Sequence, residues 1–309
     1  MKYFYTLLLC LCSLICCAQT QYKIPNHAKR ILFLGNSISY QGHYITYIET
    51  VLSLENPNGS EKTFINVGLP SETVSQLSEP NHAQGAFPRP KLQERLGRIL
   101  DKTKPDFVIA CYGINDGIYM PFDSDRFKAY QKGMLWLNNE LIKKKLPVLY
   151  LTPSPYDKMS DPAYSNVIDL YSNWLMSLSF TKNWNVIDVH EGMKNELLNH
   201  RKTKPNFTFT RDGIHPTPHG HWVMAKQILA GLGLQHMLQY TTFAQALQNY
   251  QHGEAVYKLI NQRQQLMKDA WLTYTGHKRP QMKKGIPIAQ AKEQHFIIQQ
   301  KINNLLKAQ

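Results

Sequence analysis

The sequence predicts an α/β protein, a three-layer α/β/α sandwich around a parallel sheet, followed by a C-terminal helical hairpin. Short apolar runs alternate with longer helical patterns, which is typical of repeated βαβ units. The apolar runs are continuous, as expected for parallel strands that are buried on both faces. From about Gln235 onward there are two long helical patterns and no strand candidate. The 309 residues are enough for one α/β domain and an appendage.

Five strands separated by helices are expected in the sheet domain. The strand segments are, in chain order, 30–35, 63–67, 105–112, 147–152 and 184–189. Helical periodicity occurs in 43–54, 92–100, 124–145, 164–180 and 219–232. Two further helices are expected over 254–274 and 287–308, joined by a loop rich in basic residues, 275–285. We interpret the tail, 235–309, as a hairpin packed on a sheet domain that covers 19–234.

The first eighteen residues differ from the domain that follows. Met1–Ala18 carries one charged residue, Lys2, and an apolar run too short to span a bilayer comfortably, and it ends in small residues. This pattern predicts a secretory signal peptide over 1–18. A membrane anchor and lipidation of Cys17 after cleavage are the alternatives. We therefore expect an exported protein, periplasmic, secreted or envelope-associated, with no transmembrane segment after removal of the signal.

Charge and cysteine content narrow the class of protein. The formal net charge is +13, from 35 Lys and Arg against 22 Asp and Glu. No zinc finger or aromatic RNA-binding motif accompanies this charge, so no nucleic-acid partner is expected. Because the protein is expected to be exported, an acidic polysaccharide or a component of the cell envelope is the expected partner. A charged surface that only contacts solvent explains the net charge equally well. Only Cys111 lies beyond the predicted signal, so no internal disulfide is expected, and its apolar surroundings favour burial over a nucleophilic role.

A serine follows the first predicted strand directly, in Gly35-Asn36-Ser37. In a parallel sheet, ligands bind at the carboxyl ends of the strands. A serine at this turn projects its hydroxyl into that crevice, and the start of the next helix favours developing negative charge. A serine that only caps the helix is the alternative.

Three more motifs converge on the same edge of the predicted sheet. Asp212 precedes His215 by three residues in a loop, a spacing that lets the carboxylate orient the imidazole as a base toward a serine. Asn115 follows the third strand, where its side-chain amide can donate to an oxyanion. Gly68 follows the second strand, where its backbone N–H can turn toward the same point. Taken singly, each is equally explained as a turn.

The order Ser, Gly, Asn, His along the chain resembles the SGNH (GDSL-like) hydrolase family, from residue 31 to about 230. The resemblance implies a flavodoxin-like fold and a Ser-His-Asp triad. Ser37 is then the nucleophile, and His215 is the general base and acid that Asp212 orients. No cofactor is implied.

The resemblance further implies an oxyanion hole made by the N–H groups of Ser37 and Gly68 and the Asn115 amide. Two positions depart from the family pattern: Asn36 replaces the usual Asp, and Ser71 replaces a glycine, so the loop after Gly68 is expected to differ in shape. Three residues are expected to contact substrate, with plain packing as the alternative for the aromatic ones: Asn36, Tyr112 and Tyr119.

A cluster of histidines near Asp212 and a basic loop, His277–Pro280, are two further candidates for ligand binding. His215, His219 and His221 lie close together near Asp212, but the last two stand at a helix start where both cannot easily share a ligand with His215, so we expect no metal. The loop His277–Pro280 either reaches over the site to bind an anionic part of a substrate or only connects two helices.

Ester hydrolysis is the activity that the resemblance implies. We expect an exported serine esterase, an acetylesterase that removes O-acetyl groups from a polysaccharide or oligosaccharide. Because the protein is basic, this carbohydrate can be anionic. A lipase or arylesterase acting on non-carbohydrate esters is one alternative. A non-catalytic glycan-binding protein that retains the fold is another. The polymer, the acyl group and the oligomeric state stay open.

Overall fold

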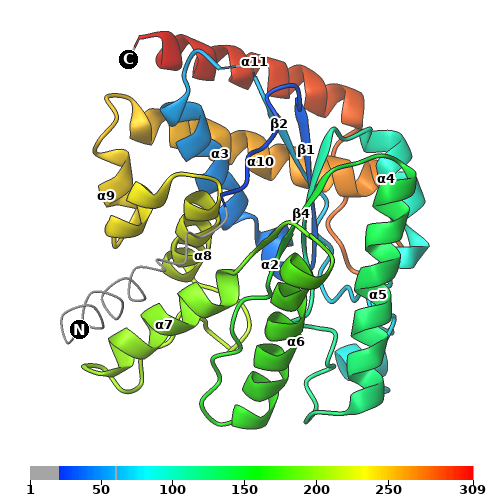
Figure 1. The fold of residues 1–309 in the computed structure, drawn as a ribbon. Helices are drawn as coiled ribbons and strands as arrows, with labels where there is room; N and C mark the ends of the chain where they lie inside the picture. The colour runs from blue at the N-terminus through cyan, green and yellow to red at the C-terminus, as the bar shows by residue number, and fades with distance from the viewer. Residues whose placement is uncertain (1–20, 60, 309) are drawn as a thin grey trace, which may run out of the picture.

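The computed structural model describes residues 21–59 and 61–308 and contains a parallel sheet of five strands in the order β2-β1-β3-β4-β5 (Figure 1). The strands are β1 (Arg30–Gly35), β2 (Thr63–Asn66), β3 (Phe107–Cys111), β4 (Val148–Leu151) and β5 (Val186–Ile187). Every neighbouring pair is parallel. The predicted parallel α/β sandwich with C-terminal helices is thereby confirmed.

Helices cover both faces of this sheet. They are α2 (Ser37–Gln41), α3 (His43–Glu55), α4 (Leu96–Thr103), α5 (Ser124–Lys143), α6 (Pro162–Thr181), α7 (Val189–Arg201), α8 (Pro218–Gly231), α9 (Phe243–Leu247), α10 (Gly253–Thr275) and α11 (Ile288–Lys307). Short 3₁₀ turns occur at η1 (His82–Gly85), η2 (Leu92–Glu94) and η3 (Gln235–Gln239). In Figure 1, α3 and α8 lie on one side of the strands, and α4 and α5 lie on the other.

The register of the central strands brings their carboxyl ends together. Gly35, the last residue of β1, pairs with Cys111 at the end of β3, and Phe33 pairs with Asn66 at the end of β2. The loops that follow these three strands therefore start side by side at one edge of the sheet. Strand residues of β1 are buried on both faces, which explains their continuous apolar run.

Cys111 is partly buried within β3, as its apolar surroundings indicate. Desolvation raises the pKa of its thiol to about 12. The thiol therefore stays protonated at neutral pH and is a poor nucleophile.

The largest differences from the prediction occur at the last strand, in the helix expected over 92–100 and in the segment after the last strand. Val189, expected at the end of the last strand, instead begins α7, because the Asp188 side chain accepts from the backbone N–H of Glu191 and caps a helix there. The expected helix over 92–100 is divided at Arg95 into a 3₁₀ turn and α4. The prediction did not include α7, which follows the last strand directly.

The two C-terminal helices complete the sheet domain. Helix α10 packs along α3, α4 and the edge strand β2, and α11 packs on α10 (Figure 1). Arg263 of α10 forms an ion pair of 2.7 Å with Glu49 of α3, and both side chains are buried. Gln264 donates to the carbonyl oxygen of Phe64 on β2 at 3.1 Å. Covering β2 in this way protects an edge strand from pairing with another chain.

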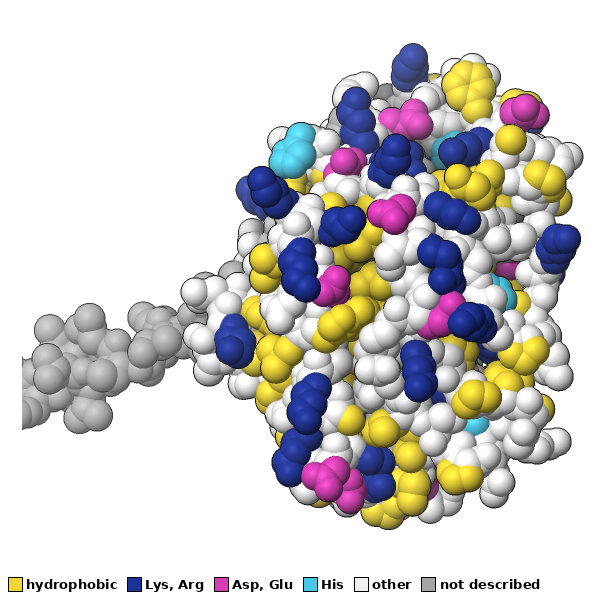
Figure 2. All heavy atoms as spheres, turned by 90° about the vertical axis from the view of Figure 1, so that its right-hand side faces the viewer, with side chains coloured by type: hydrophobic (Ala, Val, Ile, Leu, Met, Phe, Trp, Pro, Cys, Tyr) yellow, Lys and Arg dark blue, Asp and Glu magenta, His cyan; other side chains and the backbone are white. Residues whose placement is uncertain are grey.

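Charged side chains are spread over the face of the molecule that carries α4 and α5. On the face that carries α4 and α5, Lys and Arg side chains are dispersed among apolar and acidic ones and do not form one stripe (Figure 2). Among the described residues, no helix is both long and apolar enough to cross a membrane. The predicted signal peptide, with the possible lipidation of Cys17, lies outside the described residues.

Candidate active site

Ser37 stands at the junction of β1 and α2. The Asn36 side chain accepts from the backbone N–H of Ile38 at 3.1 Å and so caps the short helix that Ser37 begins. A Cβ on Gly35 would lie 2.2 Å from the hydroxyl oxygen of Ser39, so only glycine fits this tight strand-to-helix turn. The turn places Ser37 at the carboxyl edge of the sheet.

The side chains of Ser37, His215 and Asp212 form a continuous hydrogen-bonded chain. The Nε2 atom of His215 lies 2.8 Å from the Ser37 hydroxyl oxygen, and its Nδ1 atom lies 2.7 Å from Oδ2 of Asp212. The other carboxylate oxygen of Asp212 accepts from the backbone N–H groups of Ile214 and His215, at 3.0 and 2.8 Å. A nucleophile, a base and a carboxylate that orients the base are thus in hydrogen-bonding reach of one another.

The Asp212 carboxylate is held in its ionised form. Partial burial alone would raise its pKa, but the hydrogen bonds from the His215 ring and from the two backbone N–H groups outweigh burial and lower the pKa below its ordinary value. An ionised carboxylate at Nδ1 fixes the imidazole tautomer whose Nε2 can accept the serine proton.

The loop that carries this pair is anchored to the core by Asp157, which is almost fully buried. Its carboxylate accepts from the Thr208 hydroxyl at 2.7 Å and from the Phe209 backbone N–H at 2.8 Å, and it also accepts from the Thr210 hydroxyl. The Asp157 backbone N–H donates to Gly213 at 3.0 Å. No sequence motif indicated this anchor, because Asp157 precedes the loop by about fifty residues.

Asn115 follows β3 at the carboxyl edge of the sheet, and hydrogen bonds fix both the oxygen and the nitrogen of its side-chain amide. Its carbonyl oxygen accepts from the Tyr119 hydroxyl at 2.7 Å, and its Nδ2 donates to the backbone oxygen of Glu72 at 3.1 Å. A side-chain amide nitrogen carries two hydrogens, so one remains to donate to a developing oxyanion. The amide is therefore preoriented, as an oxyanion donor requires.

Gly68 lies beside Ser37 but has a different set of contacts from the one expected. Its backbone N–H donates to the side-chain oxygen of Asn66 at 2.9 Å, while the Asn66 amide nitrogen donates to Ser39 at 2.6 Å. A Cβ on Gly68 would lie 2.5 Å from the backbone nitrogen of Tyr40. Glycine is thus required here for close packing against α2, and its N–H must leave Asn66 before it can serve an oxyanion.

The three residues expected to contact substrate all have polar atoms bonded to the protein. Asn36 is 3% exposed and caps α2. Tyr112 is 1% exposed, and its hydroxyl donates to Glu72 at 2.7 Å. Tyr119 is partly buried and holds Asn115. These bonds favour a supporting role for the three side chains, and their contact with substrate stays a prediction.

A buried ionic network supports the oxyanion side of the site. Arg95 forms a bidentate ion pair with Glu72, at 2.6 and 2.8 Å, and also donates to the backbone oxygen of Val67 at 2.8 Å. Asp116 accepts three backbone N–H bonds, from Gly113, Val74 and Ser75. Sequence reasoning missed these contacts, because Glu72 and Arg95 are 23 residues apart, Val74 and Asp116 are 42 apart, and no motif links them.

The histidines considered as metal ligands are divided among different roles. His215 bonds the Ser37 hydroxyl, as described above. The Nε2 atom of His221 lies 2.9 Å from the Gln41 side-chain oxygen. In the described part of the chain, His219 forms one group with Glu196 and His200, whose ligand atoms lie within 4.8 Å of one another. Lys226, however, lies 2.7 Å from the Glu196 carboxylate and already neutralises it. The absence of a metal stays a prediction.

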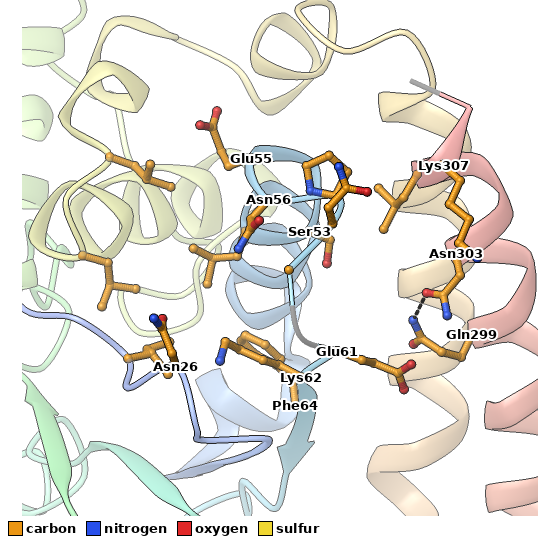
Figure 3. Close-up of a pocket in the computed structure, with 18 of the residues that line it drawn as sticks. Asn26, Ser53, Glu55, Asn56, Glu61, Lys62, Phe64, Gln299, Asn303 and Lys307 are labelled. Carbon is orange, nitrogen blue, oxygen red and sulfur yellow. Dashed lines mark hydrogen bonds between the residues drawn. The ribbon is translucent and has the colours of Figure 1, made fainter.

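The largest cavity described does not contain the triad. It measures about 600 Å³ and lies between the end of α3, the segment before β1 and α11 (Figure 3). Lys62, Asn303 and Glu61 are among its lining residues, and the Gln299 side chain bonds Asn303 at 2.7 Å. It holds no serine–histidine pair, so the chemistry is assigned to the opposite edge of the sheet.

Comparison with known proteins agrees with this geometry. The sequence profile of the GDSL-like lipase/acylhydrolase family matches residues 33–223. A comparison with curated proteins found no match.

Several solved structures are similar in fold. BT4096, described as a gut microbial diltiazem-metabolizing enzyme, matches with a TM-score of 0.56 and 21% identity, over 70% of this chain and 49% of that one. The chain thus spans about half the length of BT4096. Axe2, an acetylxylan esterase from Geobacillus stearothermophilus, matches with a TM-score of 0.53 and 21% identity, over 69% of this chain and 97% of that one. LAE5, an α/β hydrolase enzyme from the metagenome of Lake Arreo, Spain, matches with a TM-score of 0.51 and 21% identity, over 66% of this chain and 95% of that one.

Proposed function

The chain belongs to the GDSL-like lipase/acylhydrolase (SGNH) family of ester hydrolases, and from that premise we propose that it is an exported serine esterase that removes O-acetyl groups from a polysaccharide or oligosaccharide. One observation carries the serine-esterase part of this proposal: the chain from Ser37 through His215 to Asp212, with distances of 2.8 and 2.7 Å.

The proposed reaction proceeds through an acyl-enzyme. The Ser37 oxygen attacks the ester carbonyl carbon while Nε2 of His215 takes the serine proton. The carbonyl oxygen becomes an oxyanion, which accepts from the free N–H of Asn115 and from the Ser37 backbone N–H, and also from the Gly68 backbone N–H once that group has left Asn66. Collapse breaks the bond to the alcohol, which leaves with the proton from His215. Water then attacks the acyl-enzyme by the same steps, giving acetate and free Ser37.

The carbohydrate part of the proposal rests on a structural neighbour and on the sequence. Axe2 is described as an acetylxylan esterase and as an acetyl-xylooligosaccharide esterase, and it shares the fold. Two catalytic mutants of Axe2 replace a serine and an aspartate with alanine, the residue types proposed here for attack and for orienting the base. The predicted signal peptide and the basic charge agree with an exported enzyme that meets acetylated glycans.

A second candidate is an esterase that acts on non-carbohydrate esters. The description of BT4096 names a drug, diltiazem, and that protein matches this chain with a similar TM-score. Fold alone does not distinguish the two substrate classes.

The test is acetate release by the wild type and by Ser37→Ala, from acetylated polysaccharides, acetylated oligosaccharides and an aryl acetate. We expect release from a carbohydrate that is lost in Ser37→Ala. Activity on the aryl acetate alone would support the second candidate. Labelling with a serine-directed phosphonate probe is the control for a non-catalytic protein, which would stay unlabelled at Ser37.

A further inference from the structure

A second, smaller cavity lies beside the oxyanion side of the site. It measures about 190 Å³ and is formed between the segment that leads from β2 to α4 and the loop that follows α10. Its lining residues are Leu69, Phe87, Pro88, Arg89, Pro90, Lys91, Glu94, Arg95, Lys278, Arg279 and Pro280. Five of these are cationic and one is acidic. We call it the basic cavity.

Ion pairs neutralise only part of this charge. Arg89 pairs with Glu79 at 2.6 Å, Arg95 pairs with Glu72 at 2.6 Å, and Lys278 lies 3.6 Å from Glu94. Within residues 21–59 and 61–308, no acidic partner is found for the two remaining cations, Lys91 and Arg279. The basic cavity therefore keeps a positive charge that its own lining does not compensate.

Buried donors at the basic cavity also lack partners. Arg95 is 1% exposed, and its Nε and Nη2 atoms are bonded to Glu72 and Val67, but its Nη1 has no hydrogen-bond partner in the described structure. The buried Nε of Arg279 likewise has none. Because buried donors are nearly always satisfied, two unpartnered guanidinium N–H groups at one cavity indicate a ligand with strong acceptor atoms.

The loop that closes the basic cavity is held at both ends. Lys102 and Arg98 of α4 donate to the backbone oxygens of Tyr274 and Thr275, at 2.6 and 3.2 Å. At the other end, the Gly285 backbone N–H donates to the Thr273 hydroxyl at 2.8 Å. The Arg279 guanidinium lies 4.9 Å from the centre of the Phe87 ring, across the cavity wall. The cavity is therefore built by fixed contacts and does not depend on a free loop end.

Two residues that line the basic cavity lie next to parts of the proposed oxyanion hole. Leu69, which lines it, directly follows Gly68. Arg89, which also lines it, lies 5.0 Å above the ring of Tyr119, whose hydroxyl holds Asn115. A group bound in the cavity would thus belong to a molecule that extends from the ester.

We propose that the basic cavity binds an anionic group, a carboxylate or a sulfate, carried by the acetylated substrate next to its ester. This inference rests on the proposed esterase function and specifies it further: the carbohydrate is an acidic one, with a uronate or sulfated sugar near the acetylated position. Arg279 and Lys91 supply the uncompensated charge, and Arg95 supplies a buried donor.

Anion binding is tested first without any turnover. Titration calorimetry at fixed ionic strength measures the binding of sulfate and of glucuronate, with glucose as the neutral probe, to the full chain. We expect both anions to bind and the Lys91→Gln/Arg279→Gln double variant to weaken binding by about tenfold or more. Lys284→Gln is the matched control, because Lys284 lies on the same loop without lining the cavity. No anion binding by the wild type, or equal binding by the double variant, would overturn the proposal.

The link to substrate is tested by turnover. The ratio of kcat/KM on an acetylated acidic oligosaccharide to that on its neutral counterpart should exceed one in the wild type and fall about tenfold in the double variant. Anion binding without this preference would assign the cavity to a free anion and overturn its role in substrate recognition. If the esterase proposal itself is wrong, the wild type releases no acetate from either substrate, while calorimetry still reports the anion site.

Discussion

The two sides of the proposed active site are built in opposite ways. On the triad side, Asp212 and His215 lie three residues apart in one loop, and their side chains are 49% and 32% exposed. The oxyanion side is assembled around Asn115 from residues far apart in the chain, and its ion pair of Glu72 and Arg95 is almost completely buried. Asp212 and His215 are thus close in sequence and exposed to solvent, whereas the residues around Asn115 are far apart in sequence and excluded from solvent.

This difference predicts how each side responds to substitution. A change on the triad side removes a chemical group but exposes no buried charge, so it should alter catalysis and spare stability. A change on the oxyanion side disturbs groups that water cannot reach, so it should alter stability together with catalysis. Measuring turnover and unfolding on the same variants tests the contrast.

Asp212→Asn should have the largest effect on turnover. The amide favours the wrong imidazole tautomer and cannot stabilise the charged ring, so kcat/KM is expected to fall by about four orders of magnitude. The midpoint of thermal unfolding should stay unchanged, because the side chain is half-exposed. Steady-state kinetics and calorimetry measure the two quantities. Turnover close to wild type would remove Asp212 from the triad.

Glu72→Gln should have the largest effect on stability. It leaves the Arg95 charge buried without its partner, which is expected to lower the free energy of unfolding by about 3–5 kcal/mol. Urea denaturation measures this change. The control is Glu254→Gln, which breaks an ion pair of 2.7 Å with Lys258 that is mostly exposed on α10 and should leave stability unchanged. Equal effects of the two substitutions would contradict the contrast.

Asn115→Ala should affect both quantities. Loss of one oxyanion donor is expected to lower kcat by two to three orders of magnitude. The Tyr119 hydroxyl and the Glu72 backbone oxygen lose their partner, so the free energy of unfolding should fall by about 1–3 kcal/mol as well. Wild-type turnover in a folded variant would show that Asn115 does not stabilise the oxyanion.

Tyr119→Phe should have the smallest effect. It removes the hydroxyl that holds the Asn115 carbonyl and keeps the ring contacts with Tyr156 and Tyr164. We expect kcat to fall by about tenfold or less, with KM unchanged, because only the orientation of the donor is relaxed. A rise in KM at constant kcat would instead make Tyr119 a substrate-binding residue, as the sequence suggested.

The same contrast explains which parts of the site the sequence could predict. Ser37, Asp212, His215 and Asn115 follow strands or lie in a short motif, so their convergence at one sheet edge could be expected from chain order alone. The positions of Asn36, Tyr112 and Tyr119 could not, because an aromatic or amide side chain near a strand end can point toward a ligand or into the core with equal local preference.

The sequence by itself determined the order of the five strands, the candidate reacting side chains and the presence of two C-terminal helices, because apolar periodicity and short motifs are local properties. Only the tertiary structure decided that Asn66 occupies the Gly68 N–H, that Glu72 neutralises Arg95, and that the loop after α10 closes a basic cavity beside them. The Asn66–Gly68 bond is local, but Glu72 and Arg95 are 23 residues apart, and Arg98 contacts the end of α10 across 177 residues. Their partners are selected by burial and by the need to satisfy buried polar groups, which no single stretch of sequence encodes.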